Sequence, residues 1–533
     1  MKHLPIALLL LSPLVALHAA DAPSKKPNIV VILVDDMGFS DIGCYGSEIS
    51  TPNLDTLAAN GVRFTQFYNT SRCCPTRASL LTGLYSHQAG MGGMIQDGGE
   101  DGYRGDLNDR CVTIPEVLRT AGYSTYAAGK WHVTKYTKAD TTPEQKFNWP
   151  LQRGFDRYFG FIPGAANYFH PEGLASGNDW LPVPGEHFYT TDAFTDNAIK
   201  FINDTPTNKP FFLYLAYNAP HFPLQAPPED IAKYRGKYKI GWDKLREQRH
   251  AKEIQLGIVD QAWALSPCPD VIKAWDKLTP AEQDRFDQIM SIYAACVDHM
   301  DQAVGRLVAD LRQRGVFDNT LILFMSDNGG NAESGPDGKL LGKPAGSGDS
   351  RVYCGESWAN LENTPFRRYK HFNHEGGIAT PLIAHWPAGI PAKGELRSQL
   401  GHVIDIMSTC VEVAGAKYPA EFKGKPILPM EGKSLVPAFG NQSIERDGIY
   451  WEHFGNAAVR VGDWKLVRLG RNGAWELYNL KTDRTELHDL AAQEPARAKE
   501  LADKWDAWAV RAHVKPYPAP AKGNGKPINE KSE

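Results

Sequence analysis

Three short apolar runs constrain the fold of this chain more than any other feature. The run at residues 28–34, Asn-Ile-Val-Val-Ile-Leu-Val, is continuous and rich in β-branched side chains, which is typical of a strand buried on both faces. Residues 211–216 and 321–325 form similar apolar runs. Apolar residues at steps of three and four predict a long helix over about 288–314. Strands alternating with helices predict an α/β fold with a mostly parallel sheet covered on both faces.

The chain has 533 residues, which is long enough for a large domain and a smaller one. We assign residues 21–443 to the large α/β domain and 444–515 to a C-terminal α+β domain. Short strands joined by tight turns are predicted in the second domain, at 448–451, 458–461, 464–468 and 475–479. A helix is predicted after them at about 496–512. Residues 516–533 are rich in Pro, Gly and Lys, which predicts a flexible tail.

The first twenty residues have the layout of a secretory signal peptide. A basic start at Lys2 precedes an apolar run over 4–17 and small residues at Ala19 and Ala20. The chain contains no second apolar run of about 18 residues. We therefore expect residues 1–20 to be removed and the protein to be exported, to the periplasm or the extracellular space, without stable membrane insertion. The cleavage site itself is left open.

Charge and cysteine content exclude two classes of protein. The net charge of −4 provides no basic surface for a nucleic-acid partner. Eight cysteines in a chain of this length are too few for a disulfide scaffold, and the sequence does not determine how any of them pair.

Polar residues stand where two of the predicted strands end. Asp35 and Asp36 follow the first run, and Asp327 and Asn328 follow the third. In parallel sheets, ligands bind outside the carboxyl ends of the strands. Three carboxylates and an amide oxygen at one point would repel each other without a cation, and such hard oxygen ligands suit Ca²⁺ or Mg²⁺. Taken alone, either pair is equally consistent with ordinary turn residues at a strand end.

Reactive side chains are concentrated in two further stretches. Cys73 lies just before a predicted helix with Pro75 in its first turn, a place that lowers thiol pKa values and favours anions, and Arg77 adds a fixed charge. A buried structural thiol pair is the alternative. Lys130 and His132 are two residues apart, so on an extended segment they project to one face.

These stretches resemble the signatures of a known family. The run Cys73-Cys74-Pro75-Thr76-Arg77 followed by Leu-Leu-Thr-Gly, together with Gly122–His132, is similar to type I sulfatases of the bacterial arylsulfatase branch, in the alkaline-phosphatase superfamily. The resemblance covers the chain from about residue 26 to the C-terminal domain. It implies an alkaline-phosphatase-like fold, in which helices sandwich a large, mostly parallel mixed sheet, with residues 21–443 as the catalytic domain.

The resemblance also implies two prosthetic groups. Cys73 would be oxidised to formylglycine (3-oxoalanine) by a formylglycine-generating or maturase enzyme, while Cys74 is treated as structural. One Ca²⁺ per chain would be held by Asp35, Asp36, Asp327 and Asn328.

The resemblance assigns roles to further side chains. Lys130 matches a sulfate-binding lysine, His132 a histidine that contacts the hydrated formylglycine, and His221 a sulfate-contacting histidine. Lys370, five residues before Glu375-Gly-Gly, matches an active-site lysine. The implied catalytic set is Cys73, Arg77, Lys130, His132, His221 and Lys370, with Lys130, His221 and Lys370 binding substrate.

The expected activity is hydrolysis of sulfate monoesters, in sulfated glycans or aryl sulfates. Two alternatives stay open. A phosphonate monoester or phosphodiester hydrolase of the same superfamily would use the same tetrahedral-anion site. A non-catalytic glycan-binding protein is disfavoured, because every catalytic role has a suitable residue.

Overall fold

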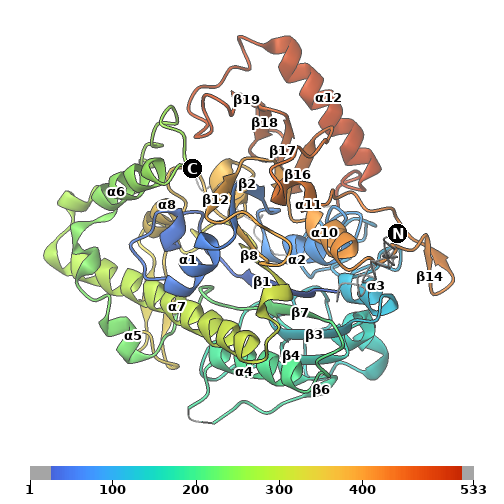
Figure 1. Cartoon of the computed structure of the whole chain (residues 1–533). Coiled ribbons are helices and arrows are strands. Elements are labelled where there is room, and N and C mark those ends of the chain that lie inside the picture. Colours follow the sequence, from blue (N-terminus) through green and yellow to red (C-terminus); the bar gives the residue numbers. More distant parts are fainter. Residues whose placement is uncertain (1–25, 186, 519–533) are drawn as a thin grey trace, which may run out of the picture.

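The computed structural model describes residues 26–185 and 187–518. The predicted signal peptide and residues 519–533 of the predicted tail lie outside this part of the chain. Its centre is a mixed sheet with the strand order β12-β2-β11-β8-β1-β7-β3-β4-β5-β6, in which β13 also pairs with β2 (Figure 1).

Five neighbouring parallel strands form the middle of this sheet. They are β8 (Thr320–Ser326), β1 (Asn28–Val34), β7 (Phe211–Ala216), β3 (Ser124–Gly129) and β4 (Arg157–Phe161). The three strands predicted from apolar runs are therefore confirmed and lie side by side. The flanking strands are β2 (Val62–Tyr68), β11 (Ala379–His385), β12 (Glu395–Arg397), β13 (Gly401–His402), β5 (Leu174–Ser176) and β6 (Asp179–Trp180).

Helices cover both faces of the sheet, as predicted (Figure 1). Val30 and Ile32 of β1 pack in one core with α1 (Pro52–Ala59), α4 (Thr190–Asn203) and α7 (Pro280–Gln313). Their neighbours Ile29 and Val31 pack in a second core with α2 (Cys73–Thr82), α3 (Ile114–Thr120) and α10 (Asp405–Val413). Alternate side chains of one strand thus enter two cores, which is why its sequence is apolar throughout.

The long helix begins eight residues earlier than expected. α7 starts at Pro280 because Thr279 and Glu282 form a capping box, in which the Thr279 hydroxyl accepts from the Glu282 backbone N–H. The apolar periodicity used for the prediction starts only after this cap.

The small C-terminal domain is an antiparallel sheet with one helix. Its strands run in the order β16 (Ile449–His453), β17 (Asn456–Val461), β18 (Trp464–Arg468) and β19 (Glu476–Asn479), followed by α12 (Pro495–Arg511). Val459 and Leu466 face α12, where they pack with Trp505. Ala458 and Val467 point the other way and join a core of the large domain. The small sheet is therefore buried on both faces.

A buried ionic network joins the two domains. Glu375 accepts from Lys465 at 2.9 Å and from Arg484 at 2.7 Å, and the Tyr68 hydroxyl donates to it at 2.8 Å. Burial alone would raise the pKa of Glu375, but the charges of Lys465, Arg484 and Arg460 lower it to about 2. The carboxylate is therefore held in its charged form at the domain boundary.

The remaining elements are short or peripheral. They are α5 (Pro228–Ala232), α6 (Trp242–Gln255), α8 (Glu356–Glu362), α9 (Glu375–Ile378), α11 (Val436–Phe439), β9 (Lys339–Leu341), β10 (Arg351–Tyr353), β14 (Glu421–Phe422) and β15 (Lys425–Pro426). All eight cysteines fall in the described ranges, and each is a free thiol. Within those ranges, no helix combines the length and the hydropathy needed to cross a bilayer.

Candidate active site

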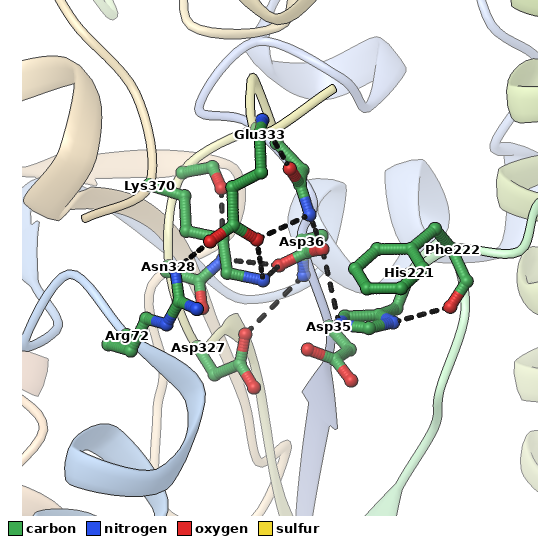
Figure 2. Close-up of polar contacts among 12 residues, drawn as sticks. Asp35, Asp36, Arg72, His221, Phe222, Asp327, Asn328, Glu333 and Lys370 are labelled. Carbon is green, nitrogen blue, oxygen red and sulfur yellow. Dashed lines mark hydrogen bonds and ion pairs between the residues drawn. The ribbon is translucent and has the colours of Figure 1, made fainter. Parts of the chain in front are cut away.

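The polar residues that follow β1 and β8 meet at one edge of the sheet. The two strands pair in parallel with Val34 opposite Ser326, so Asp35 and Asp327 leave the sheet at the same level. The Asp36 backbone N–H points to Asp327 Oδ1 at 3.4 Å, and Asn328 Nδ2 donates to Asp36 Oδ1 at 2.7 Å (Figure 2). All four side chains are buried. The expected convergence of these residues is thus seen.

This cluster has the chemistry of a cation site. Asp35 Oδ1 and Asn328 Oδ1 are buried oxygens without a hydrogen-bond partner. Burial and the adjacent Asp35 carboxylate raise the pKa of Asp327 well above its ordinary value. Unsatisfied oxygens and mutually repelling carboxylates are both relieved by a hard divalent cation. The residues present therefore fit such an ion.

Two basic side chains, Arg77 and Lys130, form ion pairs with the carboxylates of Asp35 and Asp327. Arg77 Nη2 lies 2.7 Å from Asp327 Oδ2 and 3.6 Å from Asp35 Oδ2. Lys130 Nζ lies 2.5 Å from the same Asp35 oxygen. Burial alone would raise the pKa of Asp35, but Lys130, His221 and Arg77 outweigh it and lower that pKa. Asp35 is consequently an anion in a fully buried position.

Cys73 is the first residue of α2 rather than a residue preceding it. The N-cap is Arg72, so Pro75 is the third helical residue and not the first. The sulfurs of Cys73 and Cys74 and a ring nitrogen of His132 all lie within 4.8 Å of one another. Cys74 Sγ is 3.2 Å from His132 Nε2. The hydrogen bond from Cys74, with the charge of Lys130, holds the pKa of Cys73 well below its ordinary value despite burial.

Lys130 and His132 both reach the site, but not by the expected alternation along a strand. β3 ends at Gly129, and His132 adopts a left-handed backbone conformation with φ of 56°. Trp131 is fully buried and donates from Nε1 to the carbonyl of Asn148 at 2.8 Å. Burial lowers the pKa of His132 to about 4, so its imidazole is neutral at pH 7.

His221 and Lys370 approach Asp36 from different directions (Figure 2). His221 Nδ1 donates to the Phe222 carbonyl at 2.6 Å, which leaves Nε2 3.5 Å from Asp36 Oδ2. Lys370 Nζ lies 2.6 Å from Asp36 Oδ1. Burial alone would lower the pKa of Lys370, but Asp36 and Glu333 raise it above its ordinary value. The site therefore has cationic side chains around an acidic centre.

Three residues of the site were missed in the sequence. Asn331 donates to Asp36 Oδ2 at 2.7 Å, and Glu333 Oε1 lies 2.5 Å from Arg72 Nη1. Asn331 and Glu333 belong to a loop after β8 without periodicity, so no pattern marked them. Arg72 could have been found, since it directly precedes Cys73.

Comparisons with known proteins identify the family. The family profile described as Sulfatase matches residues 27–416, and that described as N-sulphoglucosamine sulphohydrolase, C-terminal, matches 367–507. The arylsulfatase of Klebsiella aerogenes is 37% identical over 78% of this chain and 92% of its own length. An uncharacterized sulfatase of Schizosaccharomyces pombe is 36% identical over 92% of this chain and 95% of its own.

A solved structure extends the likeness to the fold. The crystal structure of Ps i-CgsB in complex with k-i-k-neocarrahexaose is 28% identical, with a TM-score of 0.67 over 92% of this chain and 94% of that one. The Sulfatase profile spans most of the chain, and two curated relatives exceed 30% identity over most of their length. The chain therefore belongs to the sulfatase family of the alkaline-phosphatase superfamily and is a sulfuric ester hydrolase.

Proposed function

We propose that this sulfatase cleaves sulfate monoesters with a hydrated formylglycine derived from Cys73 and one Ca²⁺ held by Asp35, Asp36, Asp327 and Asn328. The observation that carries this proposal is that Cys73 lies at the same sheet edge as the basic side chains of Arg77 and Lys130. Two buried oxygens without hydrogen-bond partners, Asp35 Oδ1 and Asn328 Oδ1, lie there too. The oxygen-only ligand set favours Ca²⁺ or Mg²⁺ over softer metals.

Each group supplies a defined chemistry. The aldehyde hydrate would supply a hydroxyl nucleophile at residue 73, and the cation would supply positive charge that stabilises the anionic ester. Formation of the aldehyde calls for a formylglycine-generating or maturase enzyme as a partner. Arg77 holds the carboxylates of Asp327 and Asp35 in place for the cation.

The cationic side chains bind the anion. Lys130 and Lys370 carry their ammonium groups 2.5 and 2.6 Å from Asp35 and Asp36, on either side of the acidic centre. Fixed donors of this kind stabilise the charge that shifts within a sulfate group as its S–O bond breaks. Both lysines are buried, which keeps water away and strengthens this stabilisation.

Two histidines handle protons. Because His221 Nδ1 donates to the Phe222 carbonyl, Nε2 faces the site, and it can give a proton to the departing oxygen only when the ring is the doubly protonated imidazolium. Burial lowers the pKa of His221, while the carboxylates of Asp36 and Asp35 favour that protonated form. His132 is neutral at pH 7 and lies next to residue 73, so it is placed to accept a proton there.

For the substrate we propose a sulfated glycan or an aryl sulfate. The relative from Klebsiella is named an arylsulfatase, and Ps i-CgsB was solved with k-i-k-neocarrahexaose, an oligosaccharide. We further propose export to the periplasm or beyond, supported by the layout of residues 1–20.

The first test is the mass of a peptide spanning Cys73 from protein made in its native host. A loss of about 18 Da relative to the cysteine peptide is expected, because a thiol becomes an aldehyde. An unmodified thiol in protein that turns over sulfate esters at full rate would refute the proposal.

A second test separates the alternatives. We expect an aryl sulfate to be cleaved with a higher kcat/KM than the matching aryl phosphonate. The reverse order would favour the phosphonate monoester or phosphodiester hydrolase, and binding of sulfated glycans without turnover would indicate a binding protein.

A further inference from the structure

Arg72 presents a guanidinium at the mouth of the site. It is the N-cap of α2 and directly precedes Cys73, and its carbonyl accepts from the Thr76 N–H at 3.0 Å. Its side chain is 14% exposed, in contrast to the fully buried Arg77. Because Arg72 caps a buried helix, its backbone is fixed directly beside residue 73.

Among the carboxylates drawn in Figure 2, Glu333 is the one that pairs with that guanidinium. Its side chain is 41% exposed, whereas those of Asp35, Asp36 and Asp327 are buried. Glu333 Oε2 also lies 3.7 Å from Lys370 Nζ. The carboxylate therefore bridges Arg72 and Lys370 from the solvent side.

The guanidinium retains donor capacity. Arg72 Nε is buried and has no hydrogen-bond partner, while Nη1 is engaged with Glu333. An arginine binds a carboxylate or sulfate best through two N–H groups at once. Its contact with Glu333 is made through Nη1, so an anion that engages a second N–H as well would bind in the preferred two-point manner.

The exposure of Glu333 makes it replaceable. Glu333 is the exposed partner of this pair at 41%, against 14% for Arg72, so water can hydrate its carboxylate when the pair breaks. Glu333 also places a negative charge where an anionic substrate must enter. A second anionic group on the substrate could bind Arg72 in place of Glu333, so that Arg72 would again be paired with a negative charge.

We propose that Arg72 binds a second anionic group of the substrate, a carboxylate or a further sulfate, and that Glu333 occupies this position in the free enzyme. The inference deepens the proposed function and rests on it. It assigns this sulfatase to substrates that carry a second negative charge near the scissile sulfate.

The test measures a preference ratio. With formylglycine-bearing full-length protein, kcat/KM is determined for phenyl sulfate and for its 2-, 3- and 4-carboxy derivatives. The preference ratio is the highest kcat/KM among the carboxy esters divided by the kcat/KM for phenyl sulfate. The variants are Glu333→Gln, Arg72→Gln and the double variant. Arg306→Gln is the control, since Arg306 is likewise an arginine paired with carboxylates, those of Asp192 and Asp196.

We expect Glu333→Gln to raise the ratio about three- to tenfold, and Arg72→Gln and the double variant to bring it close to one. The control should keep the wild-type ratio. An unchanged ratio in Glu333→Gln, or a raised ratio that persists in the double variant, overturns the inference. Because Glu333 is exposed, Glu333→Gln is expected to fold. Its result therefore tests the inference even if the Arg72 variants fail to fold.

Failure of the proposed function gives a different result. If the wild type cleaves neither of these esters nor any sulfated glycan, the proposed function has failed. The inference is then tested by calorimetry on the same proteins, which measures the dissociation constants of phenyl sulfate and 3-carboxyphenyl sulfate. The dissociation constant of phenyl sulfate divided by that of 3-carboxyphenyl sulfate should be highest in Glu333→Gln and close to one in Arg72→Gln and the double variant.

Discussion

Replacing Glu375 by glutamine is expected to destabilise the protein by about 3 kcal/mol at pH 7. The reason is the buried network at the domain boundary, where Lys465 and Arg484 contact this carboxylate at 2.9 and 2.7 Å. The folded-state pKa of Glu375 is about 2, against an ordinary value of 4.5. At about 1.4 kcal/mol per pKa unit, ionised Glu375 stabilises the folded state by about that amount.

The same values fix the pH dependence. The folded-state pKa lies below the unfolded-state value, so the stabilisation is complete above about pH 5 and is lost as pH falls toward 2. By pH 3, about half or more of it has gone. The difference between wild type and Glu375→Gln should therefore shrink on acidification, because the variant lacks the titrating group.

Urea unfolding followed by tryptophan fluorescence, at pH 7 and pH 3, measures this difference. Glu395→Gln is the control, because Glu395 pairs with Arg397 at 2.8 Å but is 56% exposed, and its loss should change stability by less than about 0.5 kcal/mol. A loss below about 1 kcal/mol for Glu375→Gln at pH 7, or a difference that does not shrink at pH 3, would refute the reasoning.

Three further outcomes are expected. Cys73→Ser should fold but turn over aryl sulfate poorly wherever the serine stays unoxidised, since a single hydroxyl lacks the second hydroxyl that lets the diol expel sulfate; normal multiple turnover by protein whose peptide mass shows an unmodified serine would contradict the role of Cys73. Asp327→Ala should lose bound Ca²⁺ and activity together, as elemental analysis after gel filtration would reveal, and full calcium occupancy would remove Asp327 from the ligand set. Burial alone would lower the pKa of His299, but hydrogen bonds to Asp192 and Asp230 raise it to about 9. Its stabilisation is thus present below pH 6.5 and lost as pH rises through 9, so the thermal midpoint of wild type, but not of His299→Gln, should fall more steeply over that interval.

The sequence was most informative where backbone rules act locally. Continuous apolar runs identified β1, β7 and β8, and the rule that parallel strands share a carboxyl edge correctly predicted that Asp35 and Asp327 lie close together. The family signature then located Cys73 and Lys130. Their roles as nucleophile and sulfate ligand stay predictions.

Long-range contacts between irregular segments were not predictable. Glu333 reaches Arg72 from a loop with no periodicity, 261 residues along the chain. The left-handed backbone of His132 departs from the extended segment assumed for it, because β3 already ends at Gly129. The Glu375–Lys465 pair joins two domains, and a charge pair of this kind leaves no local pattern in a sequence.

The position of Glu375 has a consequence for exchanging parts between sulfatases. One short segment carries both Lys370, which points into the site, and Glu375, which is anchored by Lys465 and Arg484 of the small domain. The C-terminal family profile begins at residue 367, ahead of both. A chimera joined at residue 444 would take Lys370 and Glu375 from one protein and the partners of Glu375, Lys465 and Arg484, from another. A junction at residue 367 would take all four residues from the same protein.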